Sequence, residues 1–254
     1  MLEIQVFPCL QDNYGFLLHC SSTGQTASFD SPEADAINAE LEARGWELTH
    51  IFNTHHHFDH AGGNEVLKAK HGCTIVGGRS DAGRIPGIDV EVGEGDVYAF
   101  GATTLQVFDV PGHTSGHVAY YCAEAGAAFV GDTVFALGCG RLFEGSPAQM
   151  WDSIQKIMAL PDDTQIYCAH EYTQANARFA VTVDPGNRQL ALRVAEIDDM
   201  RSRGEATVPT PLGLEKMTNP FLRPFASSLR ETLGMNDADD LAVFAETRRR
   251  KDNF

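Results

Sequence analysis

The chain has 254 residues and a formal net charge of −16 at pH 7, and 43% of its residues are hydrophobic. This length and composition are typical of a globular α/β protein with one large domain and one small domain. The negative charge argues against nucleic acid or an anionic membrane surface as a partner, because either would require a basic face. An anionic substrate would need a local basic patch.

The first residues do not have the pattern of a targeting signal. Residues 1–7 alternate like a strand, without the basic and apolar regions of a signal peptide, and no apolar run approaches membrane length. We therefore expect a cytoplasmic protein that does not bind membranes. The six cysteines form no CxxC pair and lie mostly in apolar segments, which predicts reduced core thiols.

Short apolar segments separated by turn residues predict strands through the first two thirds of the chain. They cover residues 2–7, 14–20, 26–30, 48–53, 74–76, 96–100, 103–110, 117–123, 126–131 and 165–168. The first three are expected to form a meander. Helices are predicted to begin at Ser31, as N-cap with Pro32 in the first turn, to cover about 62–71, and to begin at Ser146, where Ser146 to Gln149 has the form of a capping box.

The pattern becomes helical after residue 172. Thr173 to Val183 predicts one helix, Asn187 is expected to cap the next, and a last helix is expected from about Ala238. In that last helix Arg248 lies four and seven residues after Phe244 and Leu241, and Lys251 lies seven after Phe244. Both basic residues therefore extend its packed face, although a solvated basic helix end remains the alternative.

The stretch Thr54-His55-His56-His57-Phe58-Asp59-His60 follows a predicted strand and predicts a metal site. In an extended loop His55 and His57 point to one side and His56 to the other. Imidazole together with carboxylate suits zinc, iron or manganese. The adjacent pair Asp59-His60 cannot easily chelate the ion held by His55 and His57, so two ions are expected. The alternatives are a merely polar histidine-rich loop or an adventitious metal trap.

Further candidate ligands stand just after other predicted strands, where strand ends can meet on one rim of an α/β fold. They are His113, Asp132 and His170. Each has an ordinary reading in isolation: His113 or His117 as a turn histidine, Asp132 as a turn or capping residue, His170 as a helix-start residue. Together with the first cluster they make seven ligands, enough for two ions with one bridge. Asp30, also at a strand end, either orients a ligand or caps a turn.

Several motifs resemble known families. Residues 54–60, 111–114, 131–133 and 169–173 look like those of the metallo-β-lactamase superfamily of hydrolases. Residues 11–14, 138–141, 219–223 and 248–254 resemble the glyoxalase II family within it. The resemblance covers nearly the whole chain, and the second group of motifs is the more specific.

The resemblance implies an αββα four-layer sandwich over residues 1–172 and a smaller α-helical, glutathione-binding domain over 173–254. It implies that His55, His57 and His113 hold one divalent ion, that Asp59, His60 and His170 hold the other, and that Asp132 bridges them. The ions are expected to be zinc, with iron or manganese as alternatives. The implied substrate contacts are Arg141, Phe143, Tyr172, Arg248 and Lys251. Many members have Lys in place of Arg141 and Tyr in place of Phe143.

The implied activity is hydrolysis of S-(2-hydroxyacyl)glutathione, such as S-D-lactoylglutathione, to glutathione and D-lactate, the second step of methylglyoxal detoxification. A hydroxide held between the two ions would attack the thioester, with Asp132 and Asp59 as the catalytic carboxylates. The alternatives are a persulfide dioxygenase of the same superfamily, which uses one iron and lacks the helical C-terminal region, and a non-catalytic binder of glutathione conjugates. A monomer is expected.

Overall fold

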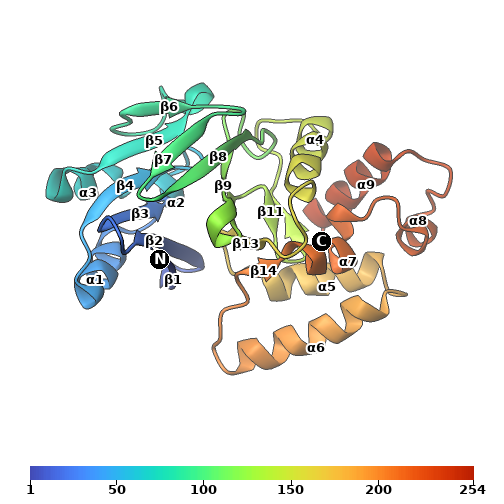
Figure 1. Ribbon diagram of the computed structural model, residues 1–254. Helices are drawn as coiled ribbons and strands as arrows, with labels where there is room; N and C mark the ends of the chain where they lie inside the picture. Colours follow the sequence, from blue (N-terminus) through green and yellow to red (C-terminus); the bar gives the residue numbers. More distant parts are fainter. The chain divides into compact units, whose positions relative to one another are not determined.

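The computed structural model describes residues 1–254 and divides the chain into two compact units. The first comprises Met1–Asp109 and Thr114–Gly131, and the second comprises Val110–His113 and Asp132–Phe254. Figure 1 shows the strands of the first unit in blue to green and the helices of the second in yellow to red. The predicted domain boundary after residue 172 stays a prediction.

The first unit contains a six-stranded sheet in the order β1-β2-β3-β4-β5-β6. Its strands are β1 Leu2–Cys9, β2 Asn13–Cys20, β3 Gln25–Phe29, β4 Leu48–Phe52, β5 Thr74–Gly78 and β6 Val90–Val92. The first three pair antiparallel, which confirms the predicted meander, and β3 to β6 pair parallel. Parallel neighbours require a crossover connection. Helix α1 Ala34–Arg44 lies in the connection from β3 to β4, and helix α3 Asn64–His71 lies in the connection from β4 to β5.

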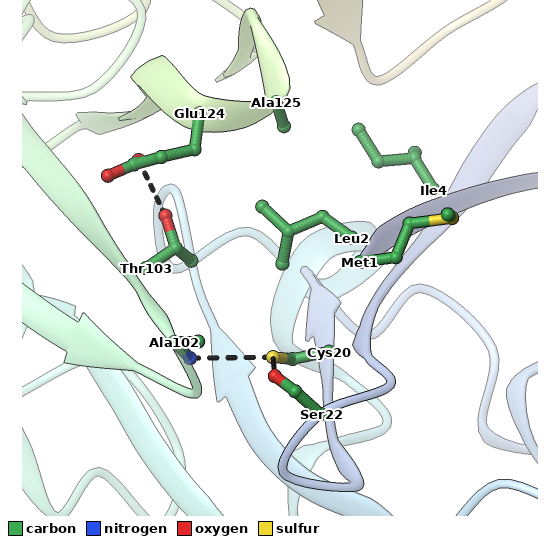
Figure 2. A pocket seen from close by; sticks show the side chains of 9 residues that line it. All are labelled: Met1, Leu2, Ile4, Cys20, Ser22, Ala102, Thr103, Glu124 and Ala125. Carbon is green, nitrogen blue, oxygen red and sulfur yellow. Dashed lines mark hydrogen bonds between the residues drawn. The ribbon is translucent and has the colours of Figure 1, made fainter.

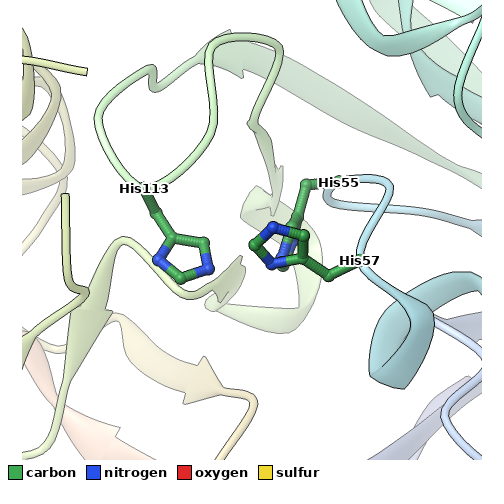
Figure 3. Close-up of side chains that lie close together, drawn as sticks. All are labelled: His55, His57 and His113. Atoms are coloured by element: carbon green, nitrogen blue, oxygen red, sulfur yellow. The ribbon is translucent and has the colours of Figure 1, made fainter. Parts of the chain in front are cut away.

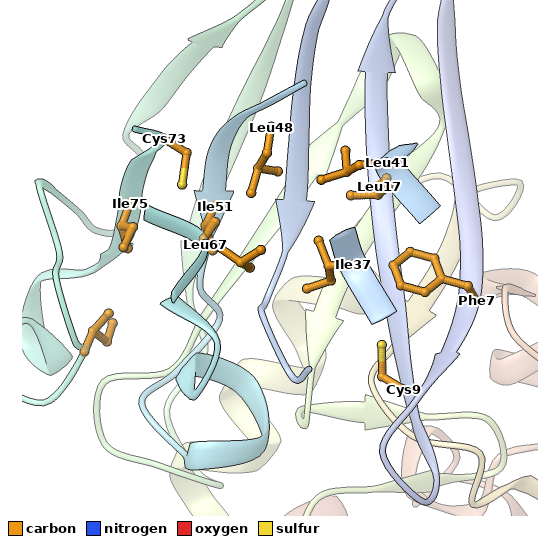
Figure 4. Close-up of a cluster of buried hydrophobic side chains, with 11 residues drawn as sticks. Phe7, Cys9, Leu17, Ile37, Leu41, Leu48, Ile51, Leu67, Cys73 and Ile75 are labelled. Carbon is orange, nitrogen blue, oxygen red and sulfur yellow. The ribbon is translucent and has the colours of Figure 1, made fainter. Parts of the chain in front are cut away.

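Helices α1 Ala34–Arg44 and α3 Asn64–His71 cover one face of this sheet. Figure 4 shows Ile37 and Leu41 of α1 and Leu67 of α3 packed against sheet residues such as Leu17 and Ile51. Burial of these side chains holds the helices on the sheet. Between the helices lies the single turn α2 Phe58–Ala61, which carries part of the predicted metal motif.

The predicted start of the first helix at Ser31 is wrong, because the N-cap is Glu33. Ser31 is fully buried, its hydroxyl donates to Asn64 Oδ1 at 2.6 Å, and its backbone N–H donates to the carbonyl of His60 at 2.7 Å. A serine whose hydroxyl donates to a residue of another helix is not available to cap its own helix.

The first unit also contains four antiparallel strands in the order β10-β9-β8-β7. They are β7 Val97–Phe100, β8 Thr103–Asp109, β9 Val118–Cys122 and β10 Ala127–Gly131. Aromatic rings fill the space between them and the first sheet: Phe29 stacks on Phe129 with centroids 3.5 Å apart, and Phe52 meets Phe100 edge-on at 5.9 Å. This aromatic core fixes the two sheets face to face.

The second unit is mainly helical and has two short antiparallel pairs, β11 Val134–Phe135 with β12 Gly138–Cys139 and β13 Gln165–Cys168 with β14 Thr210–Pro211. Its helices are α4 Pro147–Met158, α5 Thr173–Val183, α6 Arg188–Ser202, α7 Leu212–Thr218, α8 Ser227–Leu233 and α9 Asp240–Asp252. The predicted Ser146 capping box and Asn187 cap are confirmed. The last helix, predicted from about Ala238, is capped by Asp239 and begins at Asp240. No helix has both the length and the apolar character of a membrane span.

Candidate metal centre

The predicted metal motif lies in the first unit, on the loop that leaves β4 and enters α2. His55 Nε2 lies 3.0 Å from His57 Nδ1, and the rings of His55 and His60 have centroids 4.0 Å apart. Asp59 Oδ2 lies 3.5 Å from His60 Nε2. The loop therefore gathers four candidate ligands, and the expectation that His55 and His57 face the same side agrees with this geometry.

A buried aspartate orients this cluster. Asp30 follows β3 with φ of 60°, and its carboxylate accepts from the backbone N–H of Thr54 at 2.7 Å and from the Thr54 hydroxyl at 2.8 Å. The same carboxylate lies 2.8 Å from His60 Nδ1. Because Nδ1 is engaged, His60 is left with Nε2 as its ligand atom. The sequence raised both roles for Asp30, ligand orientation and turn capping, and its contacts combine the two.

The contact between Asn13 and Asp59 was not predicted from the sequence. The side-chain amide of Asn13 donates to the backbone carbonyl of Asp59 at 3.1 Å and to Asp59 Oδ2 at 3.3 Å. The only available signal was its place in the 11–14 motif, which sequence reasoning used for family resemblance alone.

The second unit brings together the three scattered candidates. His113 Nε2 lies 3.3 Å from Asp132 Oδ2, and His170 Nε2 lies 3.5 Å from Asp132 Oδ1. His113 Nδ1 lies 2.8 Å from the backbone carbonyl of Arg141, which fixes that ring. The two oxygens of Asp132 thus each face a different histidine, an arrangement suited to a carboxylate shared by two ions.

The hairpin that follows Asp132 is held by buried polar side chains from the helices. Leu137, at its tip, has φ of 58°, and its backbone N–H donates to Glu215 Oε2 at 2.9 Å. Asn219 donates to the carbonyls of Phe135 and Gly138, and Asn176 donates to that of Ala136. Since buried backbone groups are costly to leave unpaired, these contacts fix the path of the chain from Asp132 to Arg141.

Three groups of side chains could each hold a metal ion: His55, His57 and His113; His55, His60 and Asp132; Asp59, His60 and His170. Figure 3 draws the first group. The donor atoms are imidazole nitrogens and carboxylate oxygens, without thiolate, which is a set that zinc, iron and manganese accept. The seven predicted ligands therefore fit a metal centre chemically.

Two of the predicted substrate contacts are aromatic residues beside these ligands. Phe143 is 64% exposed, and its ring lies 5.1 Å from that of His113. Tyr172 stacks on His170 with centroids 4.6 Å apart and an interplanar angle of 2°. Arg141, on the same segment as Phe143, is exposed.

The other two, Arg248 and Lys251, lie on one face of α9. Arg248 is only 4% exposed; it donates to the carbonyl of Cys139 at 2.8 Å and pairs with Asp252 at 2.8 Å. Lys251 donates to the carbonyl of Ala175 at 3.2 Å and is half-buried. The predicted packed face is thus present, because both residues turn inward.

Lys251 has an unusual acidity. Burial, followed by the positive charges of Arg248, Arg178 and Arg141, lowers the pKa of Lys251 from 10.5 to about 8. Arg178 on α5 was not singled out from the sequence, where it is one basic residue among many. Positive charges gathered around one lysine favour the binding of an anion.

A further open pocket lies in the first unit and contains none of the predicted ligands or substrate contacts. Figure 2 shows Cys20 beside Ser22 and Ala102, with Thr103 bonded to Glu124. Hydrogen bonds from the hydroxyls of Ser22 and Thr23 lower the pKa of the Cys20 thiol to about 6. All six cysteines are buried and free, as predicted.

Comparison with known proteins defines the class. The sequence model of the metallo-β-lactamase superfamily matches residues 23–170, and the chain belongs to that superfamily. Among solved structures, ETHE1 from Myxococcus xanthus has a TM-score of 0.66 at 22% identity and covers 99% of this chain and 98% of its own. TTHA1623, solved in a di-iron-bound form, has a TM-score of 0.62 at 24% identity over 87% of this chain and 100% of its own. The predicted fold class is confirmed.

The relatives specify the family further. Hydroxyacylglutathione hydrolase of Maricaulis maris is 57% identical over 253 residues, covering 100% of this chain and 99% of the relative. That of Methylococcus capsulatus is 54% identical over 254 residues, covering 100% and 99%. The model of the hydroxyacylglutathione hydrolase C-terminus matches residues 171–254. The chain belongs to the hydroxyacylglutathione hydrolase family, and the resemblance predicted from its motifs is confirmed.

Proposed function

We propose that this protein hydrolyses the thioester bond of S-(2-hydroxyacyl)glutathione, with S-D-lactoylglutathione as the substrate to test first. The observation that carries the proposal is Asp132, whose two oxygens face His113 and His170 at 3.3 and 3.5 Å, in a chain that matches hydroxyacylglutathione hydrolases from end to end. A carboxylate placed in this way is suited to joining two ions into one centre.

The proposed ligand sets are His55, His57 and His113 for one ion and Asp59, His60 and His170 for the other, with Asp132 shared. We propose zinc, with iron or manganese as alternatives. When bound, such ions make water acidic enough to serve as a nucleophile near neutral pH and stabilise negative charge on the carbonyl oxygen.

The protein's own residues keep the ligands in place. Asp30 engages His60 at Nδ1, and the carbonyl of Arg141 engages His113 at Nδ1, so each histidine offers Nε2. Preorganised rings lose little freedom when an ion binds, which favours tight binding. Asp59 and Asp132, the proposed catalytic carboxylates, act as ligands.

No residue is needed to protonate the leaving group. An ordinary thiol has a pKa of about 8.5, so a glutathione thiolate leaves far more readily than an amide nitrogen would. We therefore assign no general acid.

We propose that the cationic face formed by Arg141, Arg178 and Lys251 receives the carboxylates of glutathione. Phe143 and Tyr172, beside the ligand histidines, would contact the part of the substrate nearest the thioester. Arg248 stays a predicted contact; its bond to the carbonyl of Cys139 also supports the segment that carries Arg141.

The test follows loss of the thioester of S-D-lactoylglutathione by ultraviolet absorbance, with metal content measured on the same sample. Turnover that requires about two ions per chain supports the proposal. Oxygen uptake with glutathione persulfide would instead favour the dioxygenase alternative, which the match of the C-terminal model argues against. Binding of glutathione conjugates without turnover in the metal-loaded protein would favour the non-catalytic alternative.

The remaining expectations concern the setting of the enzyme. We propose a cytoplasmic monomer without nucleic acid or membrane partners, acting in the second step of methylglyoxal detoxification. Sedimentation of the purified protein tests the oligomeric state.

A further inference from the structure

A second buried aspartate, Asp81, contacts the metal motif at His56. Asp81 follows β5 in the short 3-10 turn Arg79–Asp81, and it is fully buried. Its Oδ2 lies 3.2 Å from the backbone nitrogen of His56 and 2.9 Å from His56 Nδ1. One carboxylate oxygen therefore holds both the main chain and the side chain of the residue between His55 and His57.

The other oxygen of Asp81 is also engaged. Oδ1 accepts from Arg84 Nη2, and the same Arg84 nitrogen donates to the hydroxyl of Ser115 at 3.0 Å. A buried carboxylate is stable only when it is paired and hydrogen-bonded, and Asp81 meets this condition through two different loops.

The backbone at Gly116 packs closely against this carboxylate. A Cβ atom at Gly116 would lie 2.1 Å from Asp81 Oδ1 and 2.7 Å from its backbone nitrogen, so no larger residue fits there. The next residue, His117, stacks on His55 with centroids 4.6 Å apart, and the N–H of Val118 donates to the carbonyl of Thr54 at 2.8 Å. Asp81 thus lies where the metal motif and the segment 115–118 meet.

We propose that Asp81 is a positioning residue for the metal centre: by holding His56 outward, it keeps His55 and His57 turned to the same side. The inference rests on the proposed function, since it assigns these two histidines to an ion. If Asp81 formed only a structural ion pair, its replacement would lower the thermal stability alone. A positioning role predicts that its replacement also lowers the affinity for metal.

The decisive measurement is zinc affinity of the full-length protein, by competition with a chromophoric chelator, alongside thermal unfolding of the same samples. Asp81→Asn keeps the size of the side chain but loses its charge, and we expect zinc affinity to fall roughly 10- to 100-fold, as for other residues that orient metal ligands. KM for the thioester should change less than kcat, because the cationic face is untouched.

Asp184→Asn is the matched control. Asp184 is also a buried carboxylate, 1% exposed, and pairs with Arg223 at 2.6 Å and Ser228 at 2.6 Å, but it touches no candidate ligand. This variant should lose thermal stability and retain the zinc affinity of the wild type. Asp81→Asn with a lowered Tm and unchanged zinc affinity would overturn the inference.

His56→Ala decides the matter if Asp81→Asn does not fold. It removes the ring contact but leaves the backbone N–H on Asp81, so a smaller fall in zinc affinity is expected, and unchanged affinity would again count against the inference. A wild-type protein that binds none of zinc, iron and manganese would instead refute the proposed function.

Discussion

The two units supply candidate ligands in different ways. The first unit takes four of them from the single stretch 55–60 and fixes this stretch with the side-chain carboxylates of Asp30 and Asp81. The second unit takes His113, Asp132 and His170 from three separate strand ends and fixes them largely through backbone carbonyls and the clamped hairpin. The first arrangement depends on charge, and the second depends on the path of the chain. Substitutions that remove a carboxylate charge should therefore weaken metal binding chiefly in the first unit.

The largest effect is expected from Asp132→Ala in the second unit. Loss of a ligand shared by both ions should reduce kcat by more than the roughly 100-fold that loss of an outer partner costs, and should lower metal content. Activity and metal content measured together check this. Asp163→Ala, an exposed aspartate in the same unit, should leave both unchanged. Near-normal kcat with full metal content in Asp132→Ala would remove Asp132 from the centre.

Asp30→Asn tests the first unit. Asparagine tolerates the positive φ of this position, so the backbone should hold, while His60 loses its anionic partner at Nδ1. We expect metal affinity to fall roughly 10- to 100-fold, and titration of zinc binding measures it. Full affinity with normal turnover would show that charge is not what fixes this half of the centre.

Lys251 gives a pH test in the second unit. Its pKa of about 8 lies below its ordinary value, so the side chain is charged below pH 8 and becomes neutral above it. KM for the anionic thioester should rise between pH 7 and pH 9. Lys251→Arg should flatten this rise, because arginine stays charged. At pH 7, Lys251→Ala should raise KM roughly 10-fold or more, the value of one charge-assisted bond. An identical pH profile for wild type and Lys251→Arg would exclude Lys251 from substrate binding.

The smallest effect is expected from Phe143→Tyr, which adds a hydroxyl to a predicted substrate contact. One neutral hydrogen bond is worth about 0.5 to 1.5 kcal/mol, so KM should fall roughly two- to tenfold. Phe225→Tyr, at another exposed phenylalanine, is the control. Steady-state kinetics with both variants distinguishes a specific contact from a general change in surface polarity.

Helix caps could be predicted from the sequence because each depends mainly on residues close by in the chain. The Ser146 capping box and the Asn187 cap are confirmed, since a cap needs only residues two or three positions away. The Ser31 cap is wrong because the serine hydroxyl bonds Asn64 instead, 33 positions along the chain. The strands β11, β12 and β14 were not predicted, because two-residue strands are too short to show a periodic pattern, whereas the four-residue strand β13 was predicted.

By itself the sequence determined the inventory of the centre: which imidazoles and carboxylates are present, that they follow strand ends, and which family their spacing resembles. Only the tertiary structure decided which groups hold them. Asp81 meets His56 from 25 positions away, and Glu215 meets the N–H of Leu137 from 78 positions away. Contacts over such separations are made by the packing of the whole unit, and no local pattern of residues encodes them.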